Sequence, residues 1–87
     1  MAMTGMDIQQ VVALSKQMQA AAEQVRGIQA QLTSALQGTT WVGADKARFE
    51  GEWNNTHAPA LQNVQSALEQ ASQAASRNAQ EQEHASA

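Results

Sequence analysis

The chain has 87 residues, no cysteine, no tyrosine and a net charge of −3, and its hydrophobic content of 43 % includes only 3 % aromatic residues. This length allows one small domain. The lack of cysteine excludes disulfides and thiol chemistry, and the five scattered Lys and Arg residues form no basic patch for nucleic acid or anionic lipid. Because much of the apolar content is alanine, long and thin helical packing is favoured over a large core.

The first predicted helix covers about residues 7–37. Thr4 is its candidate N-cap, with Asp7 three residues later in the acidic position of a capping box. Gly27 lies inside this helix, where it costs roughly 1 kcal/mol relative to alanine.

Apolar residues of this helix repeat with a spacing of seven, in two rows that indicate the a and d positions of a bundle helix. The rows are Val11, Met18, Val25 and Leu32, and Leu14, Ala21, Ile28 and Ala35. Ile8, Ala22 and Leu36 lie beside them and widen the apolar stripe. A stripe of this width predicts contacts with more than one neighbouring helix, as in a bundle.

A turn is predicted at about residues 38–43. Gly38 can adopt the left-handed conformation that ends a helix. Thr39 and Thr40 are β-branched residues that continue a helix poorly. Gly43 allows a close backbone approach, and Asp45 places a negative charge in the first turn of the following helix.

The second predicted helix covers about residues 44–78, and the chain from 79 to 87, which has no large apolar residue, is expected to be a flexible tail. Pro59 interrupts the helix. A proline there removes the hydrogen bond to the carbonyl of Asn55, so a kink is expected near Pro59. The apolar spacing continues across this position, through residues that include Phe49, Trp53, Val64 and Leu68. We therefore expect one domain over residues 1–87 with no internal boundary.

The sequence has no recognisable catalytic, cofactor or metal-binding group. His57 and His84 lie far apart and have no acidic cluster beside them, so neither has metal-ligand spacing. Glu50 and Glu52 point to different sides of a helix and do not form the facing pair that acid–base catalysis needs. No enzymatic activity, cofactor or metal is therefore expected.

Membrane insertion and conventional secretion are not expected either. No apolar run approaches the ~20 residues of a membrane-spanning helix. The segment from Met1 to Met6 lacks the basic start and apolar stretch of a cleavable signal peptide.

Both tryptophans and the only phenylalanine lie between Trp41 and Trp53. The motif Trp41-x-Gly43, at the centre of the chain between two heptad-patterned helices and followed by Phe49 and Trp53, resembles the WXG (ESAT-like) family. The resemblance covers nearly the whole chain. The tripeptide alone is weak evidence of membership, and its specificity comes from this context.

The resemblance implies an all-α fold, an antiparallel helix-turn-helix hairpin that dimerises into a four-helix bundle. It also implies export from the cytoplasm by a type VII (ESX) secretion system, without a cleavable signal peptide, and contact with the ATPase of that system. The family's export signal is a tyrosine followed four places later by Asp or Glu, and this chain contains no tyrosine. The partner would then be a second hairpin that supplies the signal. A heterodimer is favoured over a homodimer, and both remain open.

Two sets of residues follow as candidates. Trp41 and Gly43 form the turn motif, where the indole either covers the end of the hairpin core or contributes to a recognition surface for the secretion machinery. The predicted core and dimer seam consists of Val11, Leu14, Met18, Val25, Ile28, Leu32, Phe49, Trp53, Val64 and Leu68. The predicted function is that of a secreted effector or adaptor acting through protein–protein contact. The alternative is a structural dimerisation module, or chaperone-like adaptor, that is not exported.

Overall fold

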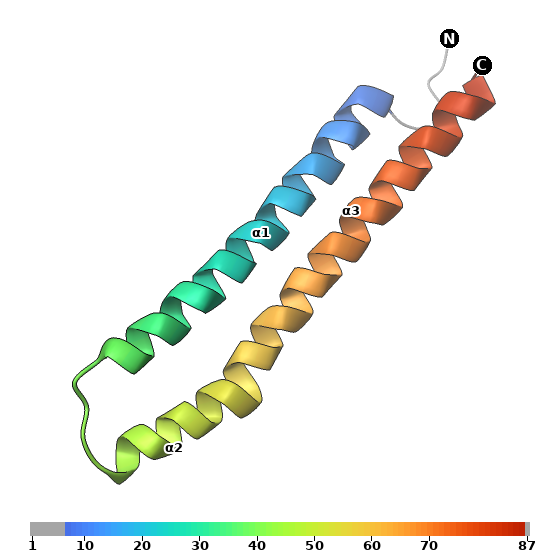
Figure 1. The fold of residues 1–87 in the computed structure, drawn as a ribbon. Helices are drawn as coiled ribbons and strands as arrows, with labels where there is room; N and C mark the ends of the chain where they lie inside the picture. The colour runs from blue at the N-terminus through green and yellow to red at the C-terminus, as the bar shows by residue number, and fades with distance from the viewer. Residues whose placement is uncertain (1–6, 87) are drawn as a thin grey trace.

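The chain folds as an α-helical hairpin, as predicted. A computed structural model describes residues 7–86, whose long dimension is 67 Å and whose short dimensions are 18 and 17 Å. Helix α1 (Ile8–Gly38) runs antiparallel to α3 (Ala58–Ser86), and the shorter α2 (Ala44–Glu52) follows the turn (Figure 1). The described residues contain no strand, and none of their helices is long and apolar enough to cross a membrane.

The two ends of α1 differ in detail from the prediction. Asp7 is itself the N-cap, because its carboxylate accepts the backbone N–H of Gln10 at 3.1 Å, and Thr4 lies outside the described residues. At the other end Gly38 is still helical. The C-cap is Thr39, in an extended conformation, and its hydroxyl donates to the carbonyl of Ala35 at 2.7 Å. The left-handed glycine expected at position 38 is therefore absent, since the hydroxyl of Thr39 satisfies a terminal carbonyl.

Small residues form the buried part of the contact between α1 and α3. The buried side chains are Ser15 and Ala22 on α1, and Ala58, Ser72 and Ala79 on α3. The Ser72 hydroxyl donates to the carbonyl of Ser15 at 2.6 Å, which sets the relative position of the two helices. Side chains of this size let the two backbones approach closely, so the hairpin interior is narrow.

The contact follows one line of residues on each helix, spaced by seven. On α1 this line is Ile8, Ser15, Ala22, Gln29 and Leu36, and on α3 it is Ala58, Gln65, Ser72 and Ala79; every member is buried or half-buried. The line on α1 therefore includes the three residues that the sequence places beside the predicted seam. The predicted rows themselves lie to one side of the contact.

A π-helical turn, η1 (Trp53–His57), joins α2 to α3 in the segment just before Pro59. There the N–H of Ala58 donates to the carbonyl of Trp53, five residues earlier, instead of four. The direction of the chain changes at this turn (Figure 1). The wider turn fits a proline, because Pro59 has no N–H with which to continue the regular α-helical pattern. In addition, the indole N–H of Trp53 donates to the hydroxyl of Thr33 at 2.9 Å and ties η1 to α1.

The expected flexible tail over residues 79–87 is wrong for residues 79–86, because α3 continues to Ser86. Ala79 is 2 % exposed, and Glu83 lies beside Ile8 and Val12 at the start of α1. The last turns of α3 therefore lie alongside the start of α1. Ala87 lies outside the described residues.

Candidate functional site

Four large apolar side chains form one exposed surface, which we call the apolar face. They are Leu14, Ile28 and Leu32 on α1 and Val64 on α3, with exposed fractions of 44, 49, 46 and 49 %. At about 100° per residue, Leu14 and Leu32 lie about 100° around α1 from Ser15, and Ile28 lies about 140° around it in the same sense. Val64 lies about 80° around α3 from Ser72, again in this sense. Because α1 and α3 are antiparallel, equal rotations of this kind lead to the same broad side of the hairpin.

The remaining seam residues predicted along α1 and α3 lie at the edge of the helix contact. Val11, Met18, Val25 and Leu68 are half-buried. They connect the buried line of small residues to the apolar face. The single chain thus covers part of each of these side chains and leaves the outer part open.

The turn motif lies at the end of the hairpin where α1 and α2 meet. Trp41 and Phe49 pack with ring centroids 5.6 Å apart and planes tilted by 45°, and they remain 38 and 39 % exposed. Val42, which follows Trp41 in the turn, is 91 % exposed. Gly43 has φ 119, a left-handed region that favours glycine, and it is the N-cap of α2.

Lys46 fixes the turn to α2. Its ammonium donates to the carbonyl of Thr39 at 3.2 Å and lies 3.7 Å from the Glu50 carboxylate. The carbonyl of Thr39 is thereby satisfied from the far side of the turn. These contacts tie the end of α1 to α2 close to the Trp41–Phe49 pair, in which the indole packs on one ring and is otherwise partly exposed.

The two histidines lie apart from each other and from Glu50 and Glu52 along the hairpin. His57 is exposed and lies 6.4 Å from the ring of Trp53, whereas His84 lies near the end of α3. Glu50 is paired with Lys46, and Glu52 is exposed. Among residues 7–86, no three His, Asp or Glu side chains are placed to share a metal ion.

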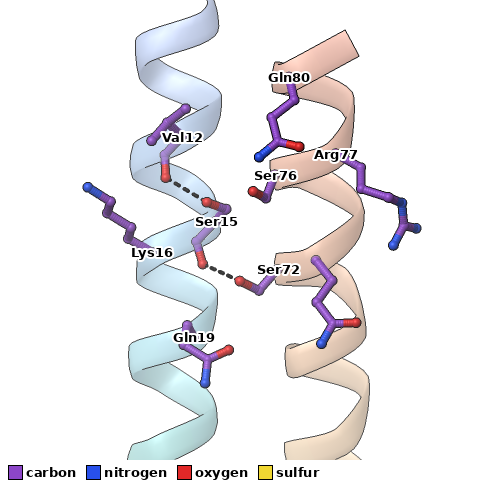
Figure 2. Close-up of a pocket in the computed structure, with 9 residues that line it drawn as sticks. Val12, Ser15, Lys16, Gln19, Ser72, Ser76, Arg77 and Gln80 are labelled. Atoms are coloured by element: carbon purple, nitrogen blue, oxygen red, sulfur yellow. Dashed lines mark hydrogen bonds between the residues drawn. The ribbon is translucent and has the colours of Figure 1, made fainter.

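A polar groove on the hairpin was not anticipated from the sequence. It encloses about 570 Å³ between the N-terminal half of α1 and the C-terminal half of α3 (Figure 2). Its lining residues are Val12, Ser15, Lys16, Gln19, Ser72, Gln73, Ser76, Arg77 and Gln80. The available sequence signal was the recurrence of serine and glutamine on one side of each helix, which is easily taken for an ordinary solvated surface.

Comparison of the chain with protein-family models, with curated proteins and with solved structures gives no match.

Proposed function

We propose that this protein is a pairing module, which joins a second helical hairpin through its apolar face to form a four-helix bundle. The observation that carries this proposal is the position of its large side chains. Among the residues that the structure describes, the buried ones are alanines and serines, whereas Leu14, Ile28, Leu32 and Val64 are nearly half exposed. Apolar side chains gathered on one face of a small helical chain are typical of an interaction surface.

Physical arguments support a helical partner. A chain of this length can bury only a limited share of its own surface, so covering the apolar face stabilises it further. The face runs along the long axis of the hairpin, from Leu14 near the start of α1 to Leu32 and Val64 nearer the turn. Two helices laid along such a face give the left-handed packing of a four-helix bundle.

We further propose that the pair is exported by type VII secretion, with Trp41 as part of the recognition surface. Resemblance of the Trp41-x-Gly43 context to the WXG family supports this step. The geometry is compatible with it, because Trp41 is held by Phe49 at the tip of the hairpin and yet keeps over a third of its surface exposed. The proposed role is as an effector or adaptor that works by protein contact and needs no catalysis. A partner hairpin, favoured to be a different chain, would supply the tyrosine-based signal.

Export can be tested by comparing culture supernatant with cell pellet in a host that carries the secretion system. Trp41→Ala is expected to reduce the secreted fraction at least tenfold while pairing is retained, because the indole lies at the tip, outside the apolar face. Val42→Ala is the matched control, since Val42 is the exposed neighbour of Trp41 in the same turn. Deletion of the gene for the paired hairpin should also abolish export.

Two results would decide against the export proposal. Equal secretion of wild type and Trp41→Ala would exclude Trp41 from recognition. Stable pairing without any secretion would favour the non-exported dimerisation module in its place.

A further inference from the structure

The polar groove carries a local charge opposite to that of the whole protein. Of the five basic residues, Arg26, Lys46 and Arg48 each have a carboxylate partner on their own helix, at 3.6, 3.7 and 3.5 Å. Lys16 and Arg77 have no such partner among residues 7–86, and both line the groove. None of the nine lining residues is acidic. The groove therefore has two unpaired positive charges in a chain whose net charge is −3.

The two cations lie on opposite rims of the groove. Figure 2 shows Lys16 on the outer side of α1 and Arg77 on the outer side of α3, with their side chains directed away from each other. A single phosphate or other small anion between the helices cannot contact both. An occupant that pairs with both rims must span the hairpin and carry negative charge on its two flanks.

The floor between the rims is polar, with three serines at its centre and glutamines on either side of them along the helices. Ser15 and Ser72 are buried, Ser76 is half-buried, and Gln19 and Gln80 extend the floor along the helices. The Ser15 hydroxyl is already donated to the carbonyl of Val12 at 2.7 Å, and that of Ser72 to the carbonyl of Ser15. At the centre of the floor Ser15, Ser72 and Ser76 are short, so another helix can approach closely there, between Gln19 and Gln80.

We propose that this groove binds an acidic α-helix of a partner protein, with carboxylates on both flanks facing Lys16 and Arg77. A groove between two adjacent antiparallel helices has the shape that accepts a third helix. The pairing follows the arrangement of helical bundles, where charged residues beside the packed seam form ion pairs between helices and select the partner. Electrostatic complementarity of this kind sets specificity more than total affinity.

The groove is separate from the apolar face. Lys16 lies about 100° around α1 from Ser15 in the sense opposite to Leu14, so it is on the other broad side of the hairpin. A partner in the groove and a hairpin on the apolar face can therefore be bound together. This inference goes beyond the proposed pairing and export, and it holds whether or not either occurs.

The test uses a synthetic helical peptide of about 21 residues, three heptads, with Ser, Ala and Gln on one face and Glu on both flanks of it. A second peptide has Lys in place of every Glu. The full-length protein, labelled with ¹⁵N, is titrated with each peptide and separately with inorganic phosphate. The Glu peptide is expected to shift the amide resonances of Ser15, Gln19, Ser72 and Ser76, and its binding should weaken as salt is raised.

Two charge-removing double variants provide the matched comparison. Lys16→Gln/Arg77→Gln should weaken binding of the Glu peptide about fivefold or more, as expected for the loss of two exposed ion pairs. Arg26→Gln/Arg48→Gln also removes two positive charges, but from positions outside the groove, and should change the affinity for the Glu peptide by less than about twofold. All four side chains are exposed, so both variants are expected to keep the helical content of the wild type.

The proposal is overturned if the Glu peptide does not bind, if the Lys peptide binds equally well, or if the shifts fall on Leu14 and Ile28. Equal effects of the two double variants would also exclude it. If phosphate alone reproduces the shifts of the Glu peptide, the groove is a small-anion site and the helical partner is wrong.

Discussion

At the scale of single residues, two hydrogen bonds link segments far apart in the sequence. The Ser72 hydroxyl reaches the carbonyl of Ser15, and the Trp53 indole N–H reaches the Thr33 hydroxyl, so the hairpin is tied once near its open end and once near its turn. Thr33 also donates to the carbonyl of Gln29 at 2.8 Å. Its hydroxyl is thus oriented to accept from Trp53, because its own proton is already used.

The Trp53–Thr33 bond gives a prediction for a double-mutant cycle. Trp53→Phe and Thr33→Val each remove one partner, and each is expected to lower the free energy of unfolding by about 0.5–1.5 kcal/mol or somewhat more through lost packing. The loss in the double variant should be smaller than the sum of the two single losses, because either single change already breaks the bond. Urea unfolding at one fixed protein concentration measures all four proteins, and fully additive losses would show that the bond contributes nothing.

Ser72 offers a second test, of close packing between the helices. Ser72→Ala should cost about 0.5–1.5 kcal/mol, the worth of one hydrogen bond. Ser72→Leu should cost about 1–3 kcal/mol, since the added volume has to enter a narrow interior. Ser66→Ala is the control: its exposed hydroxyl only accepts from Gln70 at 3.4 Å, and its loss should stay within about 0.5 kcal/mol. A leucine tolerated as well as alanine at position 72 would contradict the close approach.

At the scale of elements, two glycines of the chain have opposite roles. Gly27 lies in the exposed middle of α1, where an added Cβ has no heavy atom within 4 Å. Gly43 has equally open surroundings, but its φ of 119 lies in a region that L-residues adopt only with strain. The space around an added Cβ is therefore the same at both positions, and only the backbone conformation distinguishes the effect of a substitution on stability.

The same substitution at these two positions should change stability in opposite directions. Gly27→Ala is expected to raise the free energy of unfolding by about 1 kcal/mol, because alanine favours the helix over glycine. Gly43→Ala is expected to lower it by about 1–3 kcal/mol, the cost of a strained residue. Thermal unfolding followed by circular dichroism compares the two variants with wild type. A Gly43→Ala protein as stable as wild type would mean that this turn relaxes to another conformation without cost.

At the scale of the whole molecule, the hairpin has two unlike broad sides. One holds Leu14, Ile28, Leu32 and Val64, and the other holds the polar groove with Lys16 and Arg77. The interior between them is too narrow to bury the large side chains. Stability gained by covering them therefore has to come from another chain.

Association should depend on the apolar face and not on helix content. Ile28→Gln/Leu32→Gln is expected to shift sedimentation from a pair to a single hairpin, because it replaces two apolar side chains by polar ones. Ala20→Gln/Ala30→Gln adds the same residues at exposed positions outside this face and should leave pairing intact. Leu68→Gln is expected to weaken both folding and pairing, since Leu68 is half-buried within the hairpin itself. A wild-type protein that remains a single hairpin at every concentration, alone and with candidate partners, would refute the pairing proposal.

The sequence alone determined the first helix, the start of the second and the position of the turn. Apolar spacing by seven and the residues Gly38 to Gly43 are local properties, so they predict α1 and the turn to within a residue or two. Pro59 similarly marks the bend, because a missing N–H is a property of that one residue. The sequence also shows directly that Trp41, Phe49 and Trp53 lie close to one another along the chain.

Only the tertiary structure decided which row of α1 faces α3. The row that begins at Val11, the row that begins at Leu14 and the line through Ser15 and Ala22 all repeat every seven residues, so spacing cannot choose between them. The choice depends on what α3 presents: small residues at 72 and 79, and a Ser72 hydroxyl that reaches the carbonyl of Ser15. The tertiary structure also decided that α3 extends to Ser86, because this segment lies alongside the start of α1. Close packing between distant segments selects the smaller side chains for the buried line, and Leu14, Ile28, Leu32 and Val64 are left nearly half exposed.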